Sequence, residues 1–362
     1  MTTRSQSFWG SAWQRLQKNK GAMAGLVMIV LAVLVALFAY FIAPDSSPFA
    51  NRIMLEIGGE KPGFKQSFLL VKKEQQRSAT NILELALQGR QDVVDYLPIT
   101  HWSRKGDSLI VEKYIDEGVT ERISFHQRAV AEDPVVTKQF LLGTDSYGRD
   151  ILSRLIIGTR VSLSVGLITV LISLTVGIVL GAIAGYFRGR VDNIVMWLIN
   201  VIWSIPTLLL VFAITLILGK GFFQVFIAVG LTMWVNVARL VRGQVLATRE
   251  LQYVEAARTL GFSHARIILR HILPNILGPI LVIAASNFAS AIVIEAGLSF
   301  LGVGVQPPQP SWGLMIKENY NFIITQNPML ALAPGFAIMI LVLAFNLLGN
   351  GLRDALNVRG KL

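Results

Sequence analysis

The chain has 362 residues, of which 53% are hydrophobic and 15% are charged. Soluble domains carry about a quarter charged residues, so this composition excludes an ordinary soluble protein and indicates a membrane protein. The net charge of +11 would suggest nucleic-acid binding in a soluble protein. Here the basic residues flank apolar stretches, so we expect no nucleic-acid partner. Cysteine is absent, which excludes disulfide bonds.

Six apolar stretches have the length, or nearly the length, of a bilayer-spanning helix, which needs about 20 residues. They are 22–43, 161–186, 194–218, 222–238, 276–305 and 329–348, the fourth being short. The first is too long for the apolar region of a cleaved signal peptide, so we expect it to be retained. The pattern predicts an all-α polytopic membrane protein with six transmembrane helices in a lipid bilayer.

Basic residues gather on one side of these stretches. They precede the first, follow the second, separate the fourth from the fifth and follow the sixth: Arg4, Arg15, Lys18, Lys20, Arg188, Arg190, Arg239, Arg242, Arg249, Arg258, Arg266, Arg270, Arg353, Arg359 and Lys361. The loops after the third and fifth stretches hold few, among them Lys220 and Lys317. The positive-inside rule then places both termini and the segment 239–275 in the cytoplasm.

This topology predicts four parts of the chain. They are a cytoplasmic lead-in with the first transmembrane helix (1–43), an extracytoplasmic insert (44–139), a transmembrane core (140–350) and a cytoplasmic tail (351–362).

The insert is the part of the chain whose composition would allow it to fold as a water-exposed domain. Residues 108–125 alternate apolar and polar side chains around Asp116-Glu117-Gly118, a pattern typical of a β-hairpin. Residues 81–88 are expected to form a helix. A small α+β domain is therefore predicted, and two roles stay open: contact with a delivery protein, or a spacer or stabilising cap.

A glycine-containing segment, 141–157, follows the insert. Asp145 or Ser146 is expected to cap a helix that carries Arg149 and Arg154. We expect this helix to be short and interfacial, and to lead into the second span.

Small and polar residues inside the second and third spans suggest packing and bending. Gly177, Gly181 and Gly185 recur every four residues, which puts them on one helix face where another helix can approach closely. Pro206 follows Asn200 in the third span and should bend the helix. Such a bend suits either a transport pathway or a structural kink, and both residues are candidate pathway or gate residues.

The fifth span contains four further candidates, Ser286, Asn287, Ser290 and Glu295. An ionisable group at membrane depth is costly and rarely faces lipid, so Glu295 is a candidate site. It lies toward the outer end of the span, where it would alternatively hydrogen-bond a neighbouring helix or reach water.

No motif of an enzyme occurs in the chain. It has no phosphate-binding loop and no zinc-protease or serine-hydrolase signature. The histidines His101, His126, His264 and His271 lack the spacing of metal ligands. We therefore expect no catalytic residue, no ATPase site and no metal or cofactor bound by this chain.

The most informative segment, 255–274, is polar and lies between the fourth and fifth spans. Its characteristic residues are Glu255, Ala256, Ala257, Gly261, Leu273 and Pro274. Gly261 suits the left-handed end of a helix, and Ser263 is placed to cap a second one. Two short helices at an angle would form a rigid knob that a partner can move as a body; the alternative is an ordinary basic interfacial helix.

At these residues the chain resembles the integral-membrane permease subunits of ABC importers, whose cytoplasmic loop has E-A-A, a glycine four residues later and L-P further on. Longer segments resemble the second permease type of the dipeptide/oligopeptide and nickel importers: LLGTDSYGRDILSRLIIGTRVSL, GYFRGRVD, IPTLLL, EAGLSFLGVGVQPPQPSWG and APGFAIMILVLAFNLLGNGLRDAL. The resemblance covers the first span and 140–359. His271, Asn350 and Asn357-Val358 depart from the family pattern.

The resemblance implies a five-helix permease core preceded by one additional helix, in the inner membrane of a prokaryote. It implies four partners: a sister permease in a heterodimer, two ATP-binding subunits that use ATP and Mg²⁺, and an extracytoplasmic solute-binding protein. The helix around Glu255 would be the coupling helix in a groove of one ATPase. Spans three, five and six would line the pathway, with Asn287 and Ser290, for a peptide or a related small solute.

Two other functions are weighed against this one. A stand-alone secondary transporter or channel would show inverted repeats and charged groups at mid-bilayer, and no clear repeat is visible. An intramembrane enzyme would need paired catalytic groups, which we do not find.

Overall fold

The computed structural model describes residues 8–73, 81–219, 221–323 and 327–356. Arg4, Lys220, Arg359, Lys361 and the part of the expected tail that follows Leu356 lie outside them. The chain forms two compact units. The first comprises Met1–Ala32, Ser162–Gln306 and Ile338–Leu362, and the second comprises Val33–Val161 and Pro307–Ala337.

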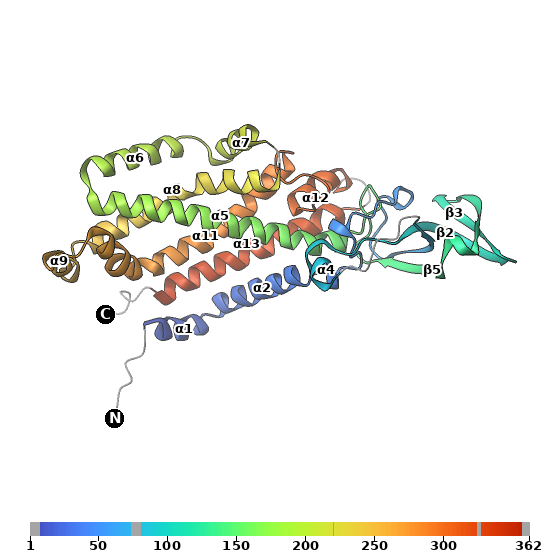
Figure 1. Cartoon of the computed structure of the whole chain (residues 1–362), viewed down its shortest axis with the longest axis horizontal. Helices are drawn as coiled ribbons and strands as arrows, with labels where there is room; N and C mark the ends of the chain where they lie inside the picture. Colours follow the sequence, from blue (N-terminus) through green and yellow to red (C-terminus); the bar gives the residue numbers. More distant parts are fainter. Residues whose placement is uncertain (1–7, 74–80, 220, 324–326, 357–362) are drawn as a thin grey trace, which may run out of the picture. The chain divides into compact units, whose positions relative to one another are not determined.

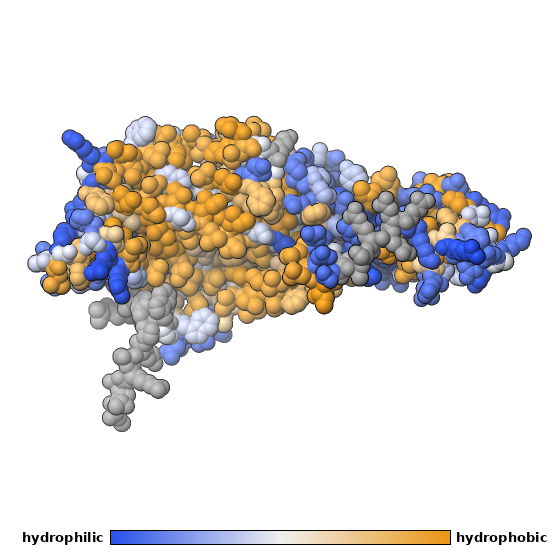
Figure 2. Space-filling view, in the orientation of Figure 1, coloured by the Kyte–Doolittle hydropathy of each residue, from blue (hydrophilic) through white to orange (hydrophobic). Residues whose placement is uncertain are grey.

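The first unit is a bundle of helices, and most of its visible surface is apolar (Figure 2). Its described helices include α1 (Phe8–Lys18), α6 (Gly189–Trp203), α7 (Thr207–Leu218), α8 (Phe222–Thr248), α9 (Gln252–Thr259), α10 (His264–Arg266) and α11 (Leu277–Phe300), with most of α2 (Lys20–Leu37), α5 (Ile151–Phe187) and α13 (Met329–Leu356). Helices α5, α8 and α11 run side by side (Figure 1) and share a buried core that includes Ala182, Val237 and Ile280.

Five helices in the described part of the chain are long and apolar enough to cross a membrane, namely α2, α5, α8, the run 264–300 and α13. Helices α6 and α7 are bent by 93° at the break between them. If the two together form one broken span, they add a sixth crossing. The bend expected at Pro206 is therefore a complete break, with Pro206 preceding the first residue of α7. The predicted fourth span, 222–238, is the first part of a longer helix, because α8 continues to Thr248 with Val241 and Val245 buried.

Helix α1, the start of α2 and the end of α13 lie at one end of the bundle. Leu16 and Ala22, from α1 and α2, pack against Ala355 in α13. A Cβ on Gly278, at the start of α11, would lie 3.4 Å from Leu356. The beginning of the chain, the end of α13 and the segment before α11 therefore share the same end of this unit.

The second unit is built around an antiparallel sheet in the order β4-β3-β2-β1-β5. Its strands are β1 (Phe64–Lys72), β2 (Val94–Lys105), β3 (Ser108–Asp116), β4 (Val119–His126) and β5 (Val130–Phe140). It also holds the helices α3 (Ala39–Ile42), α4 (Ile82–Gln88) and α12 (Trp312–Asn319). Strands β3 and β4 form the predicted hairpin, and α4 lies within the predicted 81–88. The sheet buries Leu69, Ile99 and Val111.

The helix expected within 141–157 is neither short nor separate. It is the beginning of α5, and Asp150 caps it, accepting hydrogen bonds from the backbone N (2.9 Å) and the hydroxyl of Ser153. Asp145 does not cap it; its carboxylate accepts from the backbone N–H groups of Tyr147 (2.9 Å) and Arg149 (3.0 Å) and closes a turn. Burial raises the pKa of Asp150, while the hydrogen bonds from Ser153 oppose that rise.

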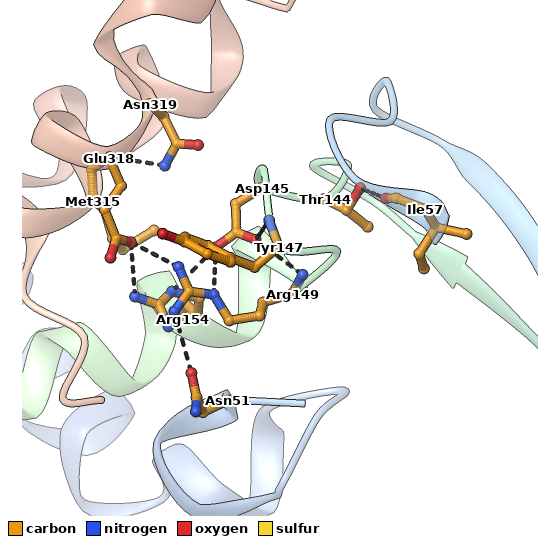
Figure 3. Close-up of polar contacts among 10 residues, drawn as sticks. All are labelled: Asn51, Ile57, Thr144, Asp145, Tyr147, Arg149, Arg154, Met315, Glu318 and Asn319. Carbon is orange, nitrogen blue, oxygen red and sulfur yellow. Dashed lines mark hydrogen bonds and ion pairs between the residues drawn. The ribbon is translucent and has the colours of Figure 1, made fainter. Parts of the chain in front are cut away.

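A buried cluster of charges joins three segments of the second unit (Figure 3). The Nε atom of Arg149 lies 2.6 Å from Asp145 Oδ2, and its Nη2 atom lies 2.7 Å from Glu318 Oε2 in α12. Arg154 is 1% exposed and reaches the same Glu318 oxygen at 3.3 Å. Arg149 Nη1 also donates to Asn51 Oδ1 at 3.1 Å. The start of α5 is thereby tied to α12 and to the chain before β1.

Replacing Asp145 with asparagine should weaken this unit strongly. The change leaves two buried arginines with Glu318 as their remaining carboxylate, and breaking a buried pair from one side costs about 3–5 kcal/mol. We expect the thermal unfolding transition of the purified chain to shift downward. The exposed Asp133→Asn makes the same chemical change as a control and should stay within about 0.5 kcal/mol of the parent. Equal transitions for the two variants would contradict the role of the cluster.

Candidate functional site

The polar segment between α8 and α11 forms two short helical pieces joined by a tight turn (Figure 1). Helix α9 ends at Thr259, and the second piece begins with α10, continues as a π-helical turn over Ile267–Ile272 and a 3₁₀ turn over Leu273–Ile276, and runs into α11. Ser263 has the extended backbone of a helix cap, but its side chain makes no capping hydrogen bond. The predicted Ser263 cap was therefore wrong in its side-chain contact.

Gly261 closes the end of α9. Its φ is +77°, in the left-handed region that favours glycine. The N–H of Phe262 donates to the carbonyl of Ala257 at 3.2 Å, and that of Gly261 donates to Arg258 at 3.0 Å. This pair of bonds is the Schellman arrangement, and it fixes the direction in which the chain leaves α9.

Apolar side chains hold the two pieces against the bundle. Val254 and Ala257 of α9 are buried with Ile267, Ile272 and Ile276 of the second piece, in one core with side chains of α5 and α8. We call residues 252–276 the knob. Because both halves of the knob share this core, it should move with the helices as one body.

Polar contacts on either side of the knob reinforce this core. The Tyr186 hydroxyl lies 2.9 Å from His264 Nδ1, and Arg249 Nη1 donates to the Tyr186 carbonyl. Asn275 Nδ2 donates to the Tyr253 hydroxyl at 2.9 Å and to the His271 carbonyl at 2.6 Å. Burial raises the pKa of Tyr253, and the hydrogen bond from Asn275 opposes that rise.

The outer surface of the knob is exposed and partly apolar. Glu255, Ala256 and Gly261 are exposed, and so is Leu260, with 73% of its surface accessible. The exposed surface of the knob therefore combines an apolar side chain, a small alanine and a charged carboxylate. Of the predicted knob residues, Ala257 is buried, Leu273 is half-buried and Pro274 is exposed.

A second feature of this unit is a hollow bordered by α6, α7, α8, α11 and α13. One part, of about 410 Å³, has Trp203, Thr207, Asn236, Ser290 and Asn346 in its wall. An adjoining part of about 480 Å³ shares Asn236 and Ser290 and adds Arg239, Ser286 and Asn287. The hollow therefore has a polar wall inside an otherwise apolar bundle.

The structure brings some of the predicted pathway residues together and separates others. Ser286, Asn287 and Ser290 all border the hollow. Glu295 is fully buried and accepts a hydrogen bond from Ser299 Oγ at 2.6 Å. Ser299 Oγ in turn accepts from the Val305 N–H at 3.0 Å, so Glu295 supports the loop that follows α11.

Three residues of the wall, Trp203, Asn236 and Arg239, were missed in the sequence, whereas Asn200 beside them was a predicted candidate. The Arg239 guanidinium lies 3.4 Å from the centroid of the Trp203 ring, and its Nη2 donates to Asn200 Oδ1 at 3.3 Å. Trp203 Nε1 donates to Asn236 Oδ1 at 3.3 Å. The available signal was the spacing of Thr232, Asn236 and Arg239, which places them on one face of α8. In the sequence, Arg239 was counted only as one of the basic residues that indicate the cytoplasmic side.

The glycines of α5 face α8. A Cβ added to Gly177 would lie 2.5 Å from Val237 Cβ, one on Gly181 2.5 Å from the Ala238 carbonyl, and one on Gly185 2.7 Å from the Arg242 carbonyl. The two helices therefore touch through their backbones, and α8 leads directly into the knob.

No group of side chains that could hold a metal ion occurs among the described residues.

Comparisons with known proteins match most of the chain. Residues 177–360 match the family described as binding-protein-dependent transport system inner membrane component. Residues 7–54 match the N-terminal TM domain of oligopeptide transport permease C. The oligopeptide transport system permease protein OppC of Bacillus subtilis is 32% identical over 99% of this chain and 92% of that protein.

The glutathione transport system permease protein GsiD of Pectobacterium atrosepticum is 44% identical over 61% of this chain and 73% of that protein. Among solved structures, the inward-facing MetNI methionine ABC transporter covers 56% of this chain and 96% of that chain at 19% identity, with a TM-score of 0.47.

Gly181→Ala should force α5 and α8 apart. The new Cβ would meet a backbone oxygen that has no freedom to move aside, and overpacking of this kind costs about 1–3 kcal/mol. The matched control is Gly243→Ala in α8, where a Cβ meets nothing within 4 Å and alanine favours the helix by about 1 kcal/mol. Thermal unfolding followed by tryptophan fluorescence should fall for the first and hold or rise for the second. A Gly181→Ala variant as stable as the parent would contradict the close contact.

Gly261→Ala should loosen the end of α9 without a clash, because a Cβ at this position meets open space. The left-handed backbone alone should cost about 1–2 kcal/mol, a factor of about 5–30 in local opening. Hydrogen exchange at the Gly261 and Phe262 amides should accelerate accordingly. Gly261→Asn is the control, since asparagine tolerates this conformation better. Unchanged exchange in the alanine variant would mean that other contacts hold the turn.

Proposed function

This chain belongs to the family of binding-protein-dependent transport system inner membrane components, and from that membership we propose how its knob and its hollow work together. The chain is a permease subunit of an ABC importer. We propose that it forms half of the translocation pathway and receives mechanical work from a separate ATPase subunit through the knob.

The observation that supports this proposal is that the knob and the wall of the hollow belong to the same two helices. Asn236 and Arg239 lie on α8, which enters the knob, and Ser286 and Ser290 lie on α11, which leaves it. The knob is packed against both through Val254, Ile267 and Ile276. A partner that displaces the knob would therefore displace the wall of the hollow, which is how a rigid element couples two sites.

The proposed topology places the knob in the cytoplasm. The beginning of the chain and the end of α13 lie at the end of the first unit that also holds the start of α11, and the basic residues concentrate there. The positive-inside rule assigns such an end to the cytoplasm. If α6 and α7 form one broken crossing, the chain crosses the inner membrane six times, with both termini inside.

The proposed partners follow from this division of labour. Two ATP-binding subunits would use ATP and Mg²⁺, one of them holding the knob through exposed residues such as Glu255, Ala256 and Leu260. A sister permease would cover the hollow as the second half of a heterodimer, and an extracytoplasmic solute-binding protein would deliver the solute. We propose a peptide as the solute, because the relatives carry oligopeptide and glutathione in their names.

Glu255→Lys should uncouple the complex while leaving the fold intact, because the side chain is exposed on the knob. A reversed charge at the centre of the ATPase contact should lower transport-linked ATP hydrolysis in liposomes by about tenfold, equivalent to about 1.4 kcal/mol of coupling. The control, Glu121→Lys, reverses an exposed charge on β4 and should keep parental activity. Undiminished hydrolysis and uptake in the Glu255 variant would refute the coupling role. Uptake by this chain alone, without nucleotide, would instead favour a stand-alone transporter.

A further inference from the structure

Helix α4 in the extracytoplasmic insert exposes an unusually apolar face. Ile82, Leu83 and Leu87 have 79%, 72% and 58% of their surfaces accessible. The exposed Glu84 and Gln88, four residues apart, lie on another face, and Leu85 between them is half-buried. The helix is therefore amphipathic, and both its apolar and its polar face are exposed.

The orientation of α4 is fixed by contacts at both of its ends. Asn81 and Glu84 form a capping box at the first turn. At the other end, a Cβ on Gly89 would lie 2.7 Å from the Tyr40 ring of α3, and Arg160 Nη1 donates to the Ala86 carbonyl at 2.8 Å. The apolar face is thus held outward by the structure and is not free to roll inward.

The length of the first membrane helix indicates how deep in the bilayer the contact between α4 and Tyr40 lies. From Lys20 to Ile42 the nearly continuous α2 and α3 rise about 33 Å at about 1.5 Å per residue. The hydrocarbon core is about 30 Å thick. Because this length of chain matches the bilayer, we place the end of the segment at Tyr40, on which α4 packs, at a membrane surface. Figure 1 shows α4 beside this end of α2.

The apolar face of α4 also continues a surface that already belongs to the membrane. Beside it, Leu37 at the end of α2, Phe38, and Phe41 and Ile42 of α3 expose large apolar side chains, whereas Ala39 and Tyr40 are buried. They lie at and just beyond the end of α2, a helix with the length and composition of a bilayer span. A surface continuous with them, at the depth where hydrocarbon gives way to water, meets the same acyl chains.

We propose that α4 is an interfacial anchor whose Ile82, Leu83 and Leu87 insert into the outer leaflet of the bilayer. Glu84 and Gln88 then face the aqueous side, as in other helices that lie in the membrane plane. The occupant of the apolar face is lipid, not the sister permease or a solute-binding protein. The anchor holds the base of the sheet at the membrane surface. This inference depends on the chain spanning a membrane and not on the coupling proposed above.

The absence of cysteine from the chain allows a direct test with single spin labels. Leu83→Cys and Leu87→Cys report on the apolar face, Glu84→Cys and Gln88→Cys on the polar face, and Phe41→Cys gives the lipid-facing reference. Each variant is labelled in the assembled transporter in lipid nanodiscs. Collision rates are then measured with oxygen, which concentrates in lipid, and with a water-soluble nickel chelate.

At positions 83 and 87 we expect an oxygen-to-nickel ratio close to that at position 41 and several-fold above that at 84 and 88. Equal ratios on both faces, with the nickel chelate reaching 83 and 87, would show that α4 lies in water and would overturn the proposal. Low collision rates with both reagents at 83 and 87 would overturn it in favour of a protein partner. Transport by the labelled transporter separates either result from a failure of the coupling role.

Discussion

The burial of the knob against α5 and α8 is the contact on which the rest of the first unit depends. Val254, Ile267 and Ile276 lie in one core with Val241 of α8, so no flexible loop separates the exposed surface of the knob from the membrane helices. A loop held by a few polar contacts would absorb a push from a partner. Under the coupling role that we propose, a shared apolar core would transmit it, because close-packed interiors deform little.

The close approach of α5 to α8 serves the same end. The glycines of α5 bring the two backbones into contact through Val237 and Ala238, which leaves little room for one helix to slide without the other. The hollow lies on another side of α8, where Asn236 and Arg239 face it. One helix therefore carries a tight packing face, a polar wall and the entry to the knob.

Four buried or half-buried arginines of the two units each have a partner for their charge. Arg239 lies over the Trp203 ring and bonds Asn200, and Arg242 pairs with Asp192 in α6. In the second unit, Arg149 and Arg154 share Glu318. An isolated charge away from water is costly. Each of these arginines therefore contacts a hydrogen-bond acceptor or an aromatic ring.

Local patterns in the chain were enough to foresee the apolar helices, the β3–β4 hairpin and the left-handed turn at Gly261, because each depends on residues a few positions apart. The pairing of Arg149 with Glu318, the grouping of Asn236 with Ser290 and the full burial of Glu295 could not be read in that way. They depend on which helix faces meet, and no periodicity within one segment specifies its neighbours. Three-dimensional packing settled the roles of these side chains, because burial and partners are properties of the assembled helices.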